Sequence, residues 1–285
     1  MEFRPCIDIH NGKVKQIVGG SLKDLGDRAQ ENFVSEQDAA FYAKLYQKNS
    51  LKGGHIILLN ASDSPYYEAT KEQALSALRV YPGGLQVGGG ITAENAAEYL
   101  AAGASHVIVT SYVFREGRID YDRLDKLVQS IGKEHLVLDV SCKRAGEQYL
   151  VVTDRWQKLT EEAVDEALLK KLSVYCDEFL IHAVDVEGKA RGMEQELVKF
   201  IGNYTGNPIT YAGGVHSMED LYLLKKLGQN RMNVTIGSAL DLFGGSMKWE
   251  DVLTVCREKQ KDPQELSCDS ACGSYFSFMI KVWLR

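Results

Sequence analysis

The sequence predicts an α/β fold, a (βα)8 TIM barrel built from two repeated half-barrels. Two observations lead to this fold class. Eight short apolar runs alternate with longer amphipathic stretches, and motifs of the first half of the chain recur in the second half. An open, doubly wound sheet gives the same alternation, but it seldom needs eight strands.

The eight apolar runs have the length and composition of parallel strands. Most are apolar at nearly every position rather than at alternate positions, which is typical of strands buried on both faces. In chain order the runs are FRPCIDI, HIILLN, LQVGGG, HVIVTS, HLVLDV, EFLIHAVD, ITYAGG and NVTIGS.

The stretches between the runs contain candidate helices. Thr92 and Ser217 are residue types that favour the N-cap, and each opens a segment that ends at a glycine. We therefore expect helices in the segments SEQDAAFYAKLYQK, TAENAAEYLAAG and SMEDLYLLKKLG.

The repeat is clearest between residues 87–111 and residues 211–238. Each segment contains a glycine pair, a helix, a further glycine, a strand and a hydroxyl residue, in that order. Asp8 and Asp139 likewise end apolar strands at corresponding places in the two halves. We expect one barrel domain over residues 1–260, made of two halves of four βα units, and a C-terminal extension over residues 261–285.

The amino-acid composition of the chain reduces the number of functions that it could have. A net charge of -6 gives no general attraction to nucleic acid or to an anionic membrane, so an anionic ligand must be captured locally. No apolar run reaches the roughly 18 residues of a membrane span, and the N-terminus has no secretory or transit character. The six cysteines lack the spacing of a zinc site and suit a reducing compartment. We expect a cytoplasmic monomer.

The carboxyl ends of the strands form the active face of such a barrel. Glycine pairs end the third and seventh runs, and hydroxyl residues end the fourth and eighth. Glycines expose backbone N–H groups to a phosphate, and a hydroxyl adds a donor. A single glycine pair fits a tight turn equally well, but the duplication favours two phosphate sites and a substrate phosphorylated at both ends. The candidate residues are Gly89, Gly90, Thr110, Ser111, Gly213, Gly214, Gly237 and Ser238.

Asp8 and Asp139 end the first and fifth runs, so we expect them on opposite sides of the barrel mouth. A carboxylate is costly to bury unpaired, and two such groups can have their pKa values pushed apart, so that one donates a proton and the other accepts one. Either residue alone could cap a loop. Their equivalent positions in the two halves favour a general acid and a general base.

His182 and Asp185 end the sixth run and are candidate substrate-binding residues. His182 could orient a catalytic aspartate or bind the sugar, but a structural hydrogen bond is an equal alternative. The loop over residues 187–193 contains Gly188 and Gly192 and has the composition of a lid.

Seven motifs, in order, resemble the phosphoribosylformimino-aminoimidazole carboxamide ribotide isomerase family of histidine biosynthesis, closest to its eukaryotic-like branch. They are CIDIHNGKVKQIVGG, LQVGGGI, GASHVIVTS, VLDVSCKR, EFLIHAVDVEG, YAGGV and VTIGSALD. The resemblance implies an Amadori rearrangement of an aminoaldose to an aminoketose, with Asp8 as base and Asp139 as acid. It implies neither a metal nor an organic cofactor.

The chain departs from bacterial members of that family at two places. His182 stands where many have Thr, and Ile91-Thr92 follows the third-strand glycines where an Arg is common. The sister cyclase of the same pathway, which works with a glutaminase, is one alternative, although it has a Lys where this chain has Gln16. A non-catalytic phosphoribosyl-ligand binder is another, although it would be expected to lose an aspartate. Dual specificity toward phosphoribosyl anthranilate stays open.

Overall fold

The computed structural model describes residues 1–18, 21–22, 26–187 and 192–258. The expected C-terminal extension over residues 261–285 lies outside this part of the chain. None of the described helices is long and apolar enough to cross a membrane.

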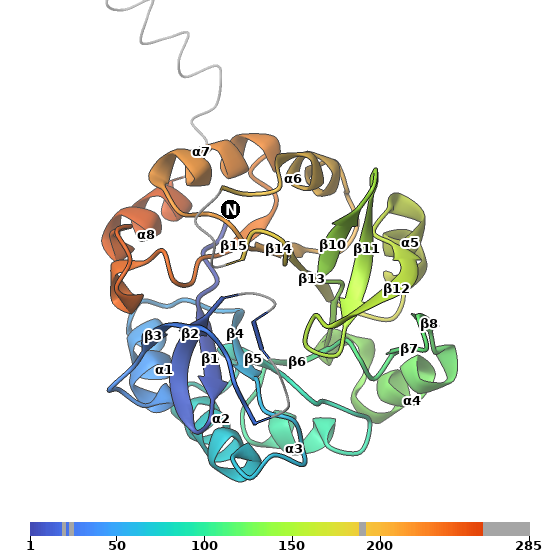
Figure 1. Ribbon diagram of the computed structural model, residues 1–285, viewed down its shortest axis with the longest axis horizontal. Coiled ribbons are helices and arrows are strands. Elements are labelled where there is room, and N and C mark those ends of the chain that lie inside the picture. The colour runs from blue at the N-terminus through green and yellow to red at the C-terminus, as the bar shows by residue number, and fades with distance from the viewer. Residues whose placement is uncertain (19–20, 23–25, 188–191, 259–285) are drawn as a thin grey trace, which may run out of the picture.

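A ring of parallel strands forms the centre of the molecule (Figure 1). Each strand pairs in parallel with the next one around the ring. Phe3 bridges Val234, where the Arg4 N–H donates a 2.8 Å hydrogen bond to the Val234 carbonyl and closes the ring. The strands confirm all eight predicted runs: β1 Cys6–His10, β4 Gly54–Leu58, β5 Leu85–Gly88, β6 His106–Val109, β9 Leu136–Asp139, β13 Glu178–His182, β14 Ile209–Ala212 and β15 Asn233–Thr235.

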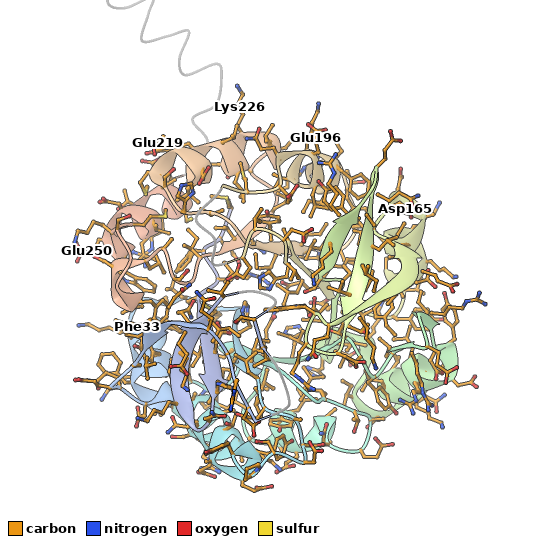
Figure 2. The ribbon with its side chains drawn as sticks, viewed as in Figure 1. Phe33, Asp165, Glu196, Glu219, Lys226 and Glu250 are labelled. Atoms are coloured by element: carbon orange, nitrogen blue, oxygen red, sulfur yellow. The ribbon has the colours of Figure 1, made fainter. Side chains whose placement is uncertain are left out.

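Helices surround the ring, and within the described residues one α-helix follows each barrel strand (Figure 1). Figure 2 shows the side chains of Glu219, Lys226 and Glu250 on the outer rim, away from the barrel centre. The helices are α1 Ala39–Lys48, α2 Tyr67–Val80, α3 Ala96–Ala101, α4 Tyr121–Ile131, α5 Glu166–Leu172, α6 Gln195–Gly202, α7 Met218–Leu227 and α8 Trp249–Arg257, with short 3₁₀ turns at Lys133–His135 and Asp241–Phe243.

The two predicted N-caps have different outcomes. Ser217 caps α7, since its side chain accepts a hydrogen bond from the Asp220 N–H, which confirms the prediction. Thr92 does not open α3, so that prediction is wrong. The Thr92 carbonyl accepts hydrogen bonds from the N–H groups of Asn95 and Ala96, which forms a separate turn and delays the helix to Ala96.

Additional strands follow β1 and β9, the two strands that end near the predicted aspartates. After β1 comes the hairpin of β2 Lys13–Ile17 and β3 Glu31–Val34, and after β9 comes the antiparallel sheet of β10 Cys142–Ala145, β11 Gln148–Thr153 and β12 Lys158–Ala163. A small hairpin, β7 Phe114–Arg115 and β8 Arg118–Ile119, follows β6. The first and fifth βα units thus both carry antiparallel insertions, of two strands, the first of them paired with β1, in the first unit and of a separate three-stranded sheet in the fifth.

The barrel interior has an apolar layer above a polar floor. Ile108, Val137, Leu180 and Ala212 pack together inside the ring. At the amino end, the buried Glu178 carboxylate pairs with Arg4 and accepts hydrogen bonds from Gln86 at 3.0 Å and from Thr210 at 2.5 Å. Because this floor fills the amino end, the space for a ligand lies at the carboxyl ends of the strands.

Candidate active site

A cavity of about 500 Å³ lies at the carboxyl ends of the strands. It is enclosed by residues from all eight barrel units and by the turn between β11 and β12. Eleven of the twelve predicted site residues line it: Asp8, Gly89, Gly90, Thr110, Ser111, Asp139, His182, Gly213, Gly214, Gly237 and Ser238.

Asp8 lies on β1 and faces the cavity. Its carboxylate accepts a 3.2 Å hydrogen bond from Gln16 Nε2 on the adjacent β2. Burial and the nearby charge of Glu187 raise the pKa of Asp8 to about 7, against the opposing effects of His182 and Gln16. A carboxyl group with a pKa near neutrality can hold or release a proton at physiological pH.

Asp139 ends β9 and is held by three hydrogen bonds. Oδ1 accepts from the N–H of Ser141 at 2.7 Å and from its hydroxyl at 2.5 Å, and Oδ2 accepts from the Thr110 hydroxyl at 2.9 Å. Burial raises the pKa of Asp139, although these hydrogen bonds and the charge of His182 partly oppose the rise. The Thr110 side chain therefore positions a carboxylate, a contact that the sequence analysis did not foresee.

His182 ends β13 and lowers the pKa values of both aspartates. Its Nε2 lies 3.0 Å from Glu187 Oε2, and its ring packs edge-on against Trp156 with the ring centroids 4.7 Å apart. Burial lowers the pKa of His182, but the charges of Glu187, Asp139 and Asp8 outweigh it, so the pKa is raised. An imidazolium here favours ionisation of both aspartates.

The two glycine pairs adopt matching backbone conformations. Gly89 and Gly213 have φ values of 102° and 113°, and Gly90 and Gly214 have φ values of 72° and 79°. A Cβ on Gly89 would lie 2.1 Å from the Leu58 carbonyl oxygen, so the close approach of the two backbones requires glycine there. The two pairs thus share one backbone conformation on the cavity wall, but only Gly90 has open space where a Cβ would lie, since a Cβ on Gly214 would lie 2.2 Å from the Gly192 carbonyl oxygen.

Glycine is required at position 237 for a different structural reason. A Cβ there would lie 2.2 Å from Gln16 Oε1, so the absence of a side chain leaves room for the amide that contacts Asp8. Gly237 therefore supports the aspartate as well as lining the cavity.

The turn after β11 covers part of the mouth in a strained conformation. Asp154, Arg155 and Trp156 have consecutive positive φ values of 51°, 54° and 66°. Ser111 Oγ accepts a 2.9 Å hydrogen bond from the Asp154 N–H, and Lys143 Nζ donates a 2.8 Å hydrogen bond to the Trp156 carbonyl. Ser111 thus anchors the turn that brings Trp156 to the cavity.

Asp185 does not line the cavity. Its carboxylate accepts a 2.7 Å hydrogen bond from the Arg144 N–H, so it links β10 to the segment that follows β13. Its predicted contact with substrate is not supported by this position. Residues 188–191 of the expected lid, with Gly188, lie outside the described residues.

Three residues near the chemistry were missed from the sequence. Ser141 lies two residues after Asp139, and a hydroxyl at that spacing can bind the preceding carboxylate locally. Glu187 was seen only as the start of a loop, and Trp156 has no motif that marks it. The contact between Trp156 and His182 joins the fifth and sixth βα units, which spacing in sequence does not give.

Comparisons with known proteins find relatives over most of the chain. The family model described as "Histidine biosynthesis protein" matches residues 2–248. The chain is 51% identical over 257 residues to a chloroplastic protein of Medicago truncatula, covering 89% of this chain and 81% of that protein. It is 46% identical over 246 residues to a Neurospora crassa protein, covering 85% and 93%. It is 40% identical over 268 residues to a Saccharomyces cerevisiae protein, covering 91% and 98%. All three are named 1-(5-phosphoribosyl)-5-((5-phosphoribosylamino)methylideneamino) imidazole-4-carboxamide isomerase.

Proposed function

The chain belongs to the histidine biosynthesis protein family, and we propose that it is the intramolecular aldose–ketose isomerase of that pathway. It converts phosphoribosylformimino-aminoimidazole carboxamide ribotide, an aminoaldose, to its phosphoribulosyl form. The observation that carries this proposal is the pair Asp8 and Asp139, two carboxyl groups with raised pKa values that line one cavity between two equivalent glycine segments.

The glycine segments bind the two phosphates of the substrate in this proposal. Gly90 has open space where a Cβ would lie, on the cavity wall, so a phosphate can approach its backbone closely. Gly213, Gly214 and Ser238 supply the equivalent site in the other half-barrel. The distance across the mouth then selects a substrate with a phosphate at each end.

Asp139 acts first, as the general acid. Burial keeps its proton at a higher pH than an ordinary carboxyl group would, so it can protonate the ring oxygen of the ribose. The C1′–O bond breaks, and the nitrogen at C1′ supplies its electron pair to form a protonated imine. Ser141 and Thr110 then stabilise the carboxylate that remains.

Asp8 acts as the general base. With a pKa of about 7, it exists partly as a carboxylate at neutral pH and can remove the proton from C2′. The electrons of the C2′–H bond move into the C1′–C2′ bond and neutralise the imine, which gives an enolamine. Protonation at C1′ and loss of the C2′ hydroxyl proton complete the aminoketose. No electron is gained or lost overall.

His182 and Glu187 set the charge around this chemistry. The His182 imidazolium lowers the pKa of both aspartates, whereas Glu187 raises that of Asp8 and holds the imidazolium in place. His182 thus opposes the rise that burial and Glu187 cause, and with a pKa of about 7 Asp8 is partly ionised at neutral pH. His182 is thus a positioning and charge-balancing residue in this proposal.

The residues that support the isomerase count against the alternatives. Gln16 is neutral and donates to Asp8, where the cyclase family has a lysine. Both aspartates are present and line the cavity, which a non-catalytic binder would not need. We further propose that residues 1–260 form one domain and that the protein acts as a cytoplasmic monomer. The Medicago relative is named as chloroplastic, so the compartment has to be tested separately from the activity.

An absorbance assay tests the proposal. The purified full-length protein is mixed with the formimino-linked bis-phosphoribosyl substrate, with and without ammonia, and separately with phosphoribosyl anthranilate. Isomerisation of the first substrate to its ketose form, without ammonia and without imidazole formation, is the expected result. Turnover of the separately supplied ketose form with ammonia, without isomerisation of the aldose, would assign the cyclase reaction instead. Turnover of both substrates would establish dual specificity.

A further inference from the structure

Three side chains with metal-binding atoms meet on the inner wall of the barrel. Cys6 and Asp8 are two residues apart on β1, so both point to the same side of the strand. His55 is the register partner of Cys6 on the neighbouring parallel strand β4. All three line the cavity, while the intervening Ile7 packs against the helices.

The donor atoms of this cluster converge. Cys6 Sγ, one Asp8 oxygen and one His55 ring nitrogen all lie within 4.8 Å of one another. Cys6 and His55 are buried, with relative exposures of 3% and 6%. Gln16 Nε2 contacts both Cys6 Sγ, at 3.6 Å, and Asp8 Oδ2, at 3.2 Å, which holds the thiol and the carboxylate toward one point.

We propose that Cys6, Asp8 and His55 bind one Zn²⁺ ion at the inner wall of the active-site cavity, and that this ion inhibits the enzyme by occupying Asp8. A thiolate, an imidazole and a carboxylate are the ligand types of zinc sites, and three protein ligands leave the fourth position for water from the cavity. The site rests on the cluster alone; its inhibitory effect also rests on the proposed isomerase function.

The geometry of the cluster is close to that of a bound ion. With bonds of about 2.0–2.3 Å, neighbouring donors of a tetrahedral zinc site lie roughly 3.3–3.8 Å apart. The separation of up to 4.8 Å here therefore has to shorten by up to about 1.5 Å, which requires the side chains to rotate toward the ion.

The charges of the cluster also suit a divalent cation. Zinc displaces the thiol proton of Cys6 to solvent, and the thiolate and the Asp8 carboxylate then balance the two positive charges. His55 is buried, and one of its ring nitrogens lies among the donor atoms of the cluster. Each protein ligand can therefore present a free electron pair to the ion.

Substrate and zinc exclude each other in this arrangement. Asp8 cannot remove a proton from C2′ while its carboxylate is bound to the ion. Saturating substrate also fills the cavity from which the ion enters. Zinc inhibition is therefore competitive with the bis-phosphorylated substrate, and a chelator reverses it.

Direct zinc binding is measured first, by competition with a chromogenic chelator on the full-length protein after metal has been removed. We expect one zinc per chain. Cys6→Ser and His55→Gln each weaken binding at least about 100-fold, because loss of an outer-shell partner alone costs about 10- to 100-fold. Cys142→Ser is the matched control: Cys142 is also buried but does not line the cavity, so binding in that variant stays as in the parent.

Zinc inhibition of the isomerase is then titrated in the same variants. Cys6→Ser and His55→Gln are expected to isomerise without zinc and to resist zinc that inhibits the parent and Cys142→Ser. Circular dichroism identifies a variant that fails to fold, and the other variant then decides the result.

Absence of stoichiometric binding, or equal binding by the parent and both ligand variants, overturns the site. Because binding is measured without turnover, a failed isomerase assay leaves the zinc result interpretable. Zinc binding without inhibition of an active isomerase overturns the inhibitory part.

Discussion

Replacement of Thr110 by valine separates the role of its hydroxyl from that of its shape. The hydroxyl donates a 2.9 Å hydrogen bond to Asp139 Oδ2, one of three hydrogen bonds that stabilise the ionised carboxyl group. Valine has nearly the same volume but no donor. The ionised form of Asp139 therefore loses stability, while the protonated form is little affected, so the pKa of Asp139 rises further.

The size of this rise follows from the hydrogen bond that is lost. A hydrogen bond to a charged group contributes about 1.5–3 kcal/mol, and one pKa unit corresponds to about 1.4 kcal/mol. Asp139 faces the cavity and keeps both hydrogen bonds from Ser141, so the lower end of this range applies. We expect the pKa of Asp139 to rise by about 1 unit.

The assay is the pH dependence of kcat/KM. If Asp139 donates a proton, activity falls as pH rises through its pKa, so the falling limb of the profile moves up by about 1 pH unit in Thr110→Val. Thr110→Ser keeps the donor and is the matched control, with the limb where the parent has it. A falling limb that stays in place or moves down in Thr110→Val would refute the assignment of Asp139 as the acid.

Three further predictions follow from the site. In urea unfolding, Gly213→Ala is expected to lower the free energy of unfolding by more than about 3 kcal/mol, because its Cβ would lie 2.7 Å from a backbone oxygen. Gly83→Ala is the control: with φ 70° and nothing within 4 Å of its Cβ position, it lowers that free energy by about 1–2 kcal/mol. Equal losses in the two variants would contradict the close packing at Gly213. Asp8 has a folded-state pKa of about 7, raised from its usual value of 3.8, so stability that is present below the unfolded pKa is lost as pH rises to about 7. Relative to the parent, Asp8→Asn is therefore about 4 kcal/mol more stable at pH 8 than at low pH, since about 3 pKa units are worth about 1.4 kcal/mol each; a gain independent of pH would contradict the raised pKa. Glu187→Gln lowers the pKa of His182, seen by NMR titration of its imidazole, and an unchanged value would contradict their pairing.

Much of the barrel can be predicted from the sequence because its strands are buried on both faces. That burial makes each strand a continuous apolar run, which marks all eight strands directly. Helix starts are less certain, because they depend on local hydrogen bonds. Thr92 has the right residue type for an N-cap, but its carbonyl closes a turn first, and α3 begins at Ala96.

The sequence predicts where the residues of the candidate site lie, but not which residues their side chains contact. Strand ends identify Thr110 and Ser111, yet their hydroxyls bind Asp139 and the Asp154 N–H, because the fourth βα unit lies beside the fifth. The same limit applies to metal ligands. Cys6 and His55 have no zinc-site spacing in the sequence, but the register of β1 and β4 makes them neighbours.

The central claim is that Asp8 and Asp139 perform the proton transfers of an aldose–ketose isomerisation. The most direct test measures kcat for Asp8→Asn and Asp139→Asn with the formimino-linked substrate, together with substrate Kd by calorimetry. Each substitution is predicted to lower kcat at least about 10²-fold while Kd stays within a few-fold of the parent, because only the proton transfer is lost. Near-parental kcat in either variant would contradict the claim.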